Sequence, residues 1–366
     1  EPDEAFQTAR ISPFSPGRAG RSKIFAMIGS FPSVSNRLWR LSCTLACFAA
    51  CTLLLGACTH RPMPDLHSAA NETALIPPDV TLSMSDGTRI PLRIYPAIHP
   101  LKAVVLALHG FGDSRDAWEF FAPPLSAAGI EIVAPDQRGF GATQDAGGWS
   151  STTRMIQDTR EELAWLRRRY PGVPLYVMGE SMGGAVALLL ATEPPPELSG
   201  TIILAPAIMK LGETWQTVLD GLDTIAPHWK LDGSDVPGER VASDNIHALR
   251  RMYFDPLTQH SSTIHPLFGL THLMATAFDD APRVRTPMLM IFGVRDQFVL
   301  PPYTARLLKR LPSSVRLDEF PTAHHLMSRD KRMTAQDVTS WILTPESALP
   351  SGGDVAAALW KATAQP

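Results

Sequence analysis

The chain has 366 residues, of which 45% are hydrophobic, and a formal net charge of −3 at neutral pH. This balance is typical of a globular protein that is long enough for one large α/β domain. A near-neutral charge argues against the basic face that nucleic-acid-binding proteins present, so we expect no nucleic-acid partner.

The N-terminal region has the layout of a bacterial signal peptide. Arg37 and Arg40 supply positive charge, and residues 41–55 are uncharged and mostly apolar. This stretch closes with Leu-Gly-Ala-Cys at 55–58, which resembles the lipobox of bacterial lipoproteins. The resemblance implies cleavage before Cys58 and lipidation of that cysteine. A cleaved secretory signal without a lipid and a retained membrane anchor are the alternatives.

These features divide the N-terminal part of the chain into three segments. Residues 1–26 precede Met27, a sensible start for the signal peptide, and are interpreted as an upstream extension without structure. Residues 27–57 are the expected lipoprotein signal peptide, and residues 58–78 are polar with scattered Pro and Asn, as in a tether. Thr59 after the cysteine resembles the outer-membrane pattern of such lipoproteins. We therefore expect a membrane-anchored protein of the bacterial cell envelope that faces the periplasm.

All four cysteines of the chain lie in this N-terminal region. Cys43, Cys47, Cys51 and Cys58 have apolar or small neighbours and no His or carboxylate beside them. We interpret them as small apolar residues of the targeting helix, apart from the lipidated one, and not as metal ligands. No metal site is expected elsewhere either.

Residues 79–343 are expected to form the folded domain. Residues 79–98 alternate about an Asp-Gly turn, which predicts a hairpin. Continuous apolar runs then predict parallel strands that are covered on both faces, at 103–108, 130–134, 175–178, 201–205 and 288–292, with a last strand at 315–320. Helical spacing over 152–170 and the alternation of strands and helices favour a mostly parallel sheet with helices on both faces.

Two segments depart from this alternation. Residues 208–283 hold many aromatic residues, methionines and prolines and show no clear strand. An insertion at this point lies above the carboxyl ends of the strands, where α/β sheets bind ligands, so we predict a helical lid over an apolar pocket. Residues 344–366 are expected to be a loosely held C-terminal tail with a short helix around 355–360.

The segment Gly179-Glu180-Ser181-Met182-Gly183 carries the strongest chemical signal. An apolar strand precedes it and a run of small, helix-forming residues follows it. Strand, G-x-S-x-G and helix together predict a nucleophile elbow with Ser181 at the turn.

A serine hydroxyl needs a base to remove its proton, and the base needs an acid to orient it. Asp296 follows the strand at 288–292 through a loop that contains glycine. His324 and His325 both follow the last strand and compete for the role of base. The chain order Ser, Asp, His is that of the α/β hydrolases.

The chain resembles the monoacylglycerol lipase and lysophospholipase branch of the α/β hydrolases, which is also linked to serine aminopeptidases. Residues 322–327, Thr-Ala-His-His-Leu-Met, match the family's motif with His325 as the base, which leaves His324 as a wall or surface residue. The family's His-Gly-x-Gly loop matches at 109–112, which implies an oxyanion hole made by the backbone N–H groups of Phe111 and Met182.

A second family motif, D-x-R-G-x-G, matches at 136–141. We interpret Arg138 in this motif as a structural residue that ties loops together. The residue before the nucleophile is Glu180, where the family often has His, and we expect it to make a structural hydrogen bond.

The resemblance implies an α/β-hydrolase fold and a serine hydrolase with Ser181, Asp296 and His325 as its triad and without a cofactor. The expected substrates are carboxylic esters of lipid origin, such as monoacylglycerols or lysophospholipids. A serine amidase or aminopeptidase is the alternative activity, and a binding lipoprotein without catalysis is the alternative of another class.

Overall fold

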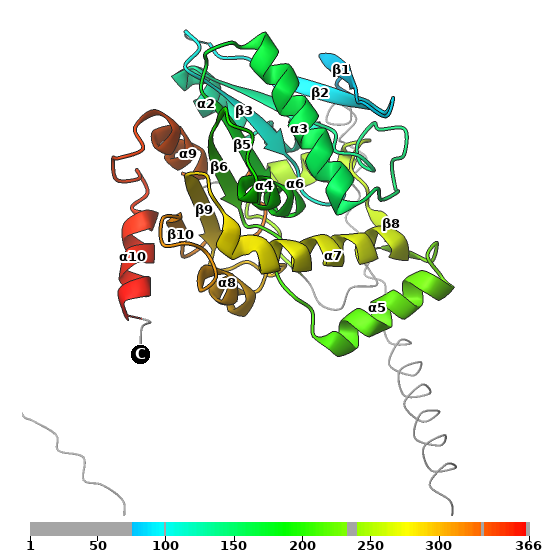
Figure 1. Cartoon of the computed structure of the whole chain (residues 1–366). Helices are drawn as coiled ribbons and strands as arrows, with labels where there is room; N and C mark the ends of the chain where they lie inside the picture. The colour runs from blue at the N-terminus through cyan, green and yellow to red at the C-terminus, as the bar shows by residue number, and fades with distance from the viewer. Residues whose placement is uncertain (1–74, 99, 233–239, 331–332, 364–366) are drawn as a thin grey trace, which may run out of the picture. The chain divides into compact units, whose positions relative to one another are not determined.

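Eight strands form one sheet in the order β1-β2-β4-β3-β5-β6-β9-β10. The structure is a computed structural model that describes residues 75–98, 100–232, 240–330 and 333–363 (Figure 1). β2 runs antiparallel to β1 and β4, and the other pairs are parallel. The strands are β1 (Val80–Ser83), β2 (Arg89–Tyr95), β3 (Ala103–Leu108), β4 (Ile130–Pro135), β5 (Leu175–Glu180), β6 (Leu198–Leu204), β9 (Met288–Gly293) and β10 (Arg316–Phe320). The expected hairpin and mostly parallel sheet are confirmed.

The central strand β3 shows why the sheet needs cover on both sides. All six of its residues are buried, and alternate side chains enter different apolar clusters. Val104, Leu106 and Leu108 join the cluster with α3 (Thr152–Arg169), α4 (Met182–Thr192) and α7 (Ile264–Asp280). Val105 and Ala107 join the cluster with α2 (Ala122–Ala128) and α9 (Thr334–Leu343). Burial of both faces accounts for the continuous apolar run in the sequence.

Helices follow most of the strands and cover the two faces of the sheet. They are η1 (Arg115–Trp118), α2 (Ala122–Ala128), α3 (Thr152–Arg169), α4 (Met182–Thr192), α8 (Pro301–Leu308) and α9 (Thr334–Leu343). The predicted helix over 152–170 is confirmed as α3, which begins after Ser151, whose hydroxyl accepts the N–H of Arg154.

Between β6 and β9 the chain leaves the sheet. This segment contains α5 (Glu213–Ile225), β7 (Lys230–Asp232), α6 (Ile246–Phe254), β8 (Ser261–Thr263), α7 (Ile264–Asp280) and η3 (Ala281–Arg283). In Figure 1, α7 packs beside α4, and α5 lies farther from the sheet. The expectation of no strand here is wrong, because β7 and β8 pair antiparallel. Each has three residues, which is too short to give a readable alternation of apolar and polar residues.

The C-terminal segment is not loosely held where the structure describes it. α10 (Gly353–Thr363) packs against β10. Leu349 is buried, and Arg316 of β10 donates from Nη2 to Oδ2 of Asp354 over 2.6 Å. The composition, rich in Pro, Gly and Ser, suggested a loose tail, but the contacts with β10 hold this segment in place.

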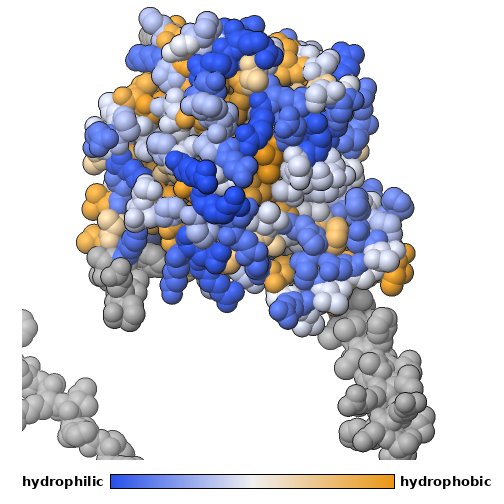
Figure 2. All heavy atoms as spheres, in the orientation of Figure 1, coloured by the Kyte–Doolittle hydropathy of each residue, from blue (hydrophilic) through white to orange (hydrophobic). Residues whose placement is uncertain are grey.

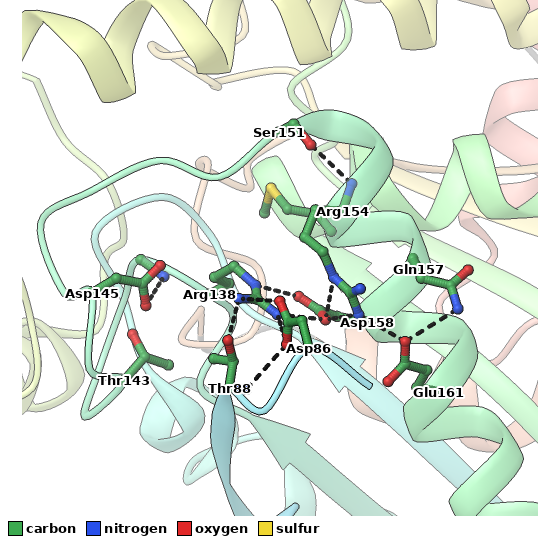
Figure 3. A network of polar contacts seen from close by, with 12 residues as sticks. Asp86, Thr88, Arg138, Thr143, Asp145, Ser151, Arg154, Gln157, Asp158 and Glu161 are labelled. Atoms are coloured by element: carbon green, nitrogen blue, oxygen red, sulfur yellow. Dashed lines mark hydrogen bonds and ion pairs between the residues drawn. The ribbon is translucent and has the colours of Figure 1, made fainter. Parts of the chain in front are cut away.

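Arg138 joins three parts of the chain, as Figure 3 shows. Its Nε and Nη2 atoms donate to the two carboxylate oxygens of Asp158 in α3 over 2.8 and 2.9 Å. Its Nη1 donates over 2.5 Å to Oγ1 of Thr88, at the turn between β1 and β2, and Asp86 lies beside it. These contacts support the structural interpretation of Arg138.

The interpretations of residues 1–26, the signal peptide at 27–57 and Cys58 concern positions outside the described residues. Within the described ranges, no helix combines the length and apolar character needed to cross a membrane.

Candidate active site

Ser181 lies at a strained turn between β5 and α4. Its φ of 52° and ψ of −112° are rare for a residue with a side chain. A Cβ on Gly179 would lie 2.1 Å from the carbonyl oxygen of Gly183, and one on Gly183 would lie 2.2 Å from that of Leu108. Glycine at both positions therefore lets the strand, the turn and the helix approach closely enough to expose the serine hydroxyl.

The structure brings Ser181, His325 and Asp296 together in one hydrogen-bonded chain. Nε2 of His325 lies 2.9 Å from Oγ of Ser181, and Nδ1 lies 2.7 Å from Oδ2 of Asp296. The other carboxylate oxygen of Asp296 accepts the N–H groups of Phe298 and Val299 over 2.8 and 2.9 Å. Because Nδ1–H donates a hydrogen bond to the carboxylate, Nε2 presents its lone pair to the serine hydroxyl.

The two residues expected to form an oxyanion hole both belong to the surroundings of Ser181. Met182 is the first residue of α4, where N–H groups have no partner within the helix. Phe111 follows β3 and lines the same cavity as Ser181. The N–H of Gly183 donates to the carbonyl of His109 over 3.2 Å, which holds the start of α4 against this loop.

His109 itself has a structural role in the His-Gly-x-Gly loop. Its ring is fully buried, and burial lowers its pKa. Nδ1 donates to the carbonyl oxygen of Gly110 over 2.7 Å, and Nε2 accepts the N–H of Gln137 over 3.0 Å. A neutral imidazole makes both bonds, so it fixes the backbone that leads to Phe111.

A cavity of about 400 Å³ opens at Ser181 and His325. Its walls are mostly apolar, and residues of the segment between β6 and β9 contribute much of them. The apolar lining includes Met209, Met252, Leu270, Met274, Phe298 and Val299, and the polar lining includes Thr258, Gln259 and His260. An apolar cavity with a few polar groups is typical of a site for a small, largely apolar ligand.

The sequence analysis missed four residues of the site: Asp113, Phe298, Ser328 and Arg329. Phe298 stacks on the His325 ring with centroids 5.0 Å apart. Ser328 and Arg329, shortly after His325, bind Glu180 and Asp113 respectively. Their nearness to the histidine motif is the one signal in the sequence, since their partners lie more than 140 residues away.

His324 does not take part in the hydrogen-bonded chain with Ser181. It belongs to the one group of potential metal ligands found among the described residues, with Asp244 and Asp330, whose ligand atoms lie within 4.8 Å of one another. The Asp330 carboxylate accepts the backbone N–H of His324 over 3.1 Å, and both aspartates have further interactions within the chain. We therefore interpret this group as a link between residues 240–245 and the loop that carries His325.

Comparisons with known proteins agree with this geometry. The protein-family model described as serine aminopeptidase, S33, matches residues 99–332. Monoglyceride lipase of Rattus norvegicus is 25% identical over 270 residues, which are 70% of this chain and 88% of the rat protein. Monoacylglycerol lipase of Mycolicibacterium smegmatis is also 25% identical, over 70% of this chain and 94% of its own.

Solved structures show the same fold. A monoacylglycerol lipase from Paleococcus ferrophilus matches with a TM-score of 0.59 and 22% identity, over 69% of this chain and 98% of its own. A soluble variant of monoglyceride lipase from Saccharomyces cerevisiae matches with a TM-score of 0.62 and 19% identity, over 78% of this chain and 98% of its own. The fold is that of the α/β hydrolases, and the chain belongs to the serine aminopeptidase, S33, family within it.

Proposed function

We propose that the protein hydrolyses carboxylic esters of lipid origin, with monoacylglycerols or lysophospholipids as the substrate class. One observation carries the proposal: the hydrogen-bonded chain from Asp296 through His325 to Ser181 ends at the floor of an apolar cavity. A nucleophile, a base and an orienting acid at these distances are what acyl transfer requires.

In the first half of the reaction, Oγ of Ser181 attacks the acyl carbon while Nε2 of His325 takes its proton. Asp296 remains ionised, holds the ring in position and stabilises the imidazolium. The charge that develops on the carbonyl oxygen is stabilised by the N–H groups of Phe111 and Met182. His325 then gives its proton to the leaving alcohol, which departs and leaves an ester on Ser181.

In the second half, water replaces the alcohol. His325 takes a proton from water, which attacks the acyl carbon through a second oxyanion in the same hole. The ester bond to Ser181 breaks, and His325 returns a proton to the serine oxygen. The fatty acid leaves, and the enzyme is restored.

The surroundings of the site favour a lipid-derived acyl group. The cavity wall is rich in Met and Leu, whose side chains contact an acyl chain without polar atoms. On the outer side of this region α5 has no buried residue, and Trp215, Ile225 and the nearby Trp229 are 68%, 83% and 58% exposed. Figure 2 shows hydrophobic residues at the surface where α5 lies. The two curated relatives named above, lipases of monoacylglycerols by name, point the same way.

An aminopeptidase is the second candidate, because the matching family carries that description. Such an enzyme needs an acidic group that binds the substrate's free amine. Among the described residues that line the cavity, Asp113 is the one acidic residue. Both of its oxygens already bind the Arg329 guanidinium, which neutralises it. The cavity therefore favours a neutral acyl group over an α-amino acid.

The test is a substrate panel with wild type and Ser181→Ala in parallel. It includes p-nitrophenyl esters from acetyl to palmitoyl, a monoacylglycerol, a lysophospholipid and an aminoacyl amide. We expect serine-dependent ester turnover with an optimum at medium or long chains. Turnover of the amide alone would move the assignment to a peptidase.

Anchoring at Cys58 is proposed as the means by which the enzyme meets its substrate. The support is the lipobox-like run at 55–58 after an apolar stretch, together with the exposed apolar residues of α5. The expected location is the outer membrane, facing the periplasm. Cys58→Ser should abolish incorporation of labelled palmitate in a bacterial host and release soluble protein or leave uncleaved precursor. Unchanged labelling of the variant would contradict the anchor.

A further inference from the structure

The base His325 lies on a segment without helix or strand. We call residues 321–330, between β10 and α9, the base loop. Nε2 of His325 lies 2.9 Å from Oγ of Ser181. Catalytic groups must stay within about 0.5 Å of their working geometry, so residues outside the base loop must hold it in place. Three and four residues beyond His325, Ser328 and Arg329 make the contacts that hold the base loop.

Glu180 is the first of these contacts. It is the last residue of β5, stands directly before Ser181 and is fully buried. One carboxylate oxygen accepts the backbone N–H of Ser328 and the other accepts its hydroxyl, each over 2.7 Å. The base loop is thus bonded to the residue next to the nucleophile, so a shift of one moves the other.

The second contact comes from the neighbouring residue of the loop. Arg329 is buried and donates through both terminal nitrogens to the two carboxylate oxygens of Asp113, over 2.5 and 2.9 Å. Asp113 follows Gly112 in the loop expected to form the oxyanion hole, and its N–H donates to the carbonyl of Gly110. A two-pronged bond of this kind fixes orientation as well as distance.

We propose that Glu180 is a positioning residue that holds His325 against Ser181 by binding Ser328, with the Arg329–Asp113 pair as its counterpart on the side of the oxyanion hole. The inference rests on the proposed ester hydrolysis. Glu180 does not line the cavity, so it acts on the base and not on the bound substrate.

A specific pair of variants separates the two hydrogen bonds of Glu180 from its charge. In Glu180→Ala the buried N–H and hydroxyl of Ser328 lose their acceptors, and the loop relaxes to satisfy them. In Glu180→Gln the amide oxygen still accepts the N–H, and the amide NH₂ donates to the hydroxyl oxygen. The Gln variant therefore keeps both links, while the Ala variant keeps neither.

The experiment measures kcat and KM on a short p-nitrophenyl ester, the rate of Ser181 labelling by a fluorophosphonate, and Tm. For Glu180→Ala we expect a kcat about 10²-fold lower, since a displacement of about 1 Å costs that much, with KM changed less than about threefold. Labelling should slow in parallel. Glu180→Gln should recover kcat to within about fivefold of wild type, because both hydrogen bonds persist.

Glu162 offers a matched control. It is also a buried carboxylate, in α3, and its charged neighbours Asp158, Glu161 and Arg138 lie outside the base loop. Glu162→Ala should lower Tm without lowering kcat of the folded protein. If Glu180→Ala does not fold, Ser328→Ala removes one of the two links and should lower kcat at constant KM.

The inference is overturned if Glu180→Ala or Ser328→Ala keeps wild-type kcat and labelling rate, or if the loss appears in KM alone. A Glu162→Ala variant with the same loss of kcat would also overturn it, since the effect would then follow from burial in general. Failure of the proposed function looks different, because wild type and Ser181→Ala would then be equally inactive.

Discussion

Replacement of Asp296 by Asn should inactivate the enzyme by fixing the wrong tautomer of His325. One oxygen of Asp296 accepts the N–H groups of Phe298 and Val299 over 2.8 and 2.9 Å. In Asp296→Asn only the amide oxygen can accept them, so the NH₂ group must take the position 2.7 Å from Nδ1 of His325. Nδ1 becomes an acceptor, Nε2 carries the proton, and no lone pair faces Ser181.

The expected fall in kcat follows because Asp296→Asn disables the base and leaves the cavity and the oxyanion hole intact. We expect kcat to fall on the order of 10⁴-fold, or about 5 kcal/mol of transition-state stabilisation, with KM nearly unchanged. Because the side chain keeps its size, keeps two of its hydrogen bonds and reverses the third, Tm should change by no more than a few degrees.

The assay is steady-state hydrolysis of a p-nitrophenyl ester, with Tm measured on the same preparations. Asp279→Asn serves as the control for the chemical change, since Asp279 is 54% exposed and pairs with Lys210 at the surface. A kcat for Asp296→Asn within tenfold of wild type would refute the argument from the tautomer.

Two further substitutions test the stability of the fold. Burial and the neighbouring Asp337 carboxylate raise the pKa of Asp318 to about 8 from 3.8. Because the folded state holds this proton more tightly, the free energy of unfolding should fall as the pH rises from about 4 to about 8. Urea unfolding should show this fall, and Asp318→Asn should flatten it; an equal slope in both would contradict the assignment. Gly183→Ala places a Cβ 2.2 Å from the Leu108 carbonyl oxygen and should cost about 1–3 kcal/mol with loss of activity. An unchanged urea midpoint and kcat would show that the elbow tolerates a side chain.

The sheet could be predicted from the sequence because its signal is local. Strands such as β3 and β9 are buried on both faces and therefore read as continuous apolar runs. The positions of Ser181 and Asp296 follow from the same logic, since Ser181 comes directly after β5 and Asp296 follows β9 by three residues. Both His324 and His325 follow β10, so the sequence alone did not identify the base, and the family motif was needed to choose between them. Both side chains are also largely buried in the structure.

What the sequence could not provide are contacts between distant segments. Glu180 and Ser328 are 148 positions apart, and neither belongs to a pattern that identifies the other. The docking of α10 on β10 was missed for the same reason, since the composition near Pro350 suggests a tail, whereas contacts such as that of Arg316 with Asp354 hold the segment on the sheet. Short strands such as β7 leave too few residues for any periodicity to be read.

The most direct test of the account is the comparison of wild type with Ser181→Ala on medium- and long-chain esters. Ser181→Ala removes the nucleophile and leaves the cavity intact, so kcat should fall by several orders of magnitude while the folded protein keeps its Tm. Ester turnover that stays near the wild-type level in Ser181→Ala would contradict the assignment of Ser181 as the nucleophile and with it the proposed function.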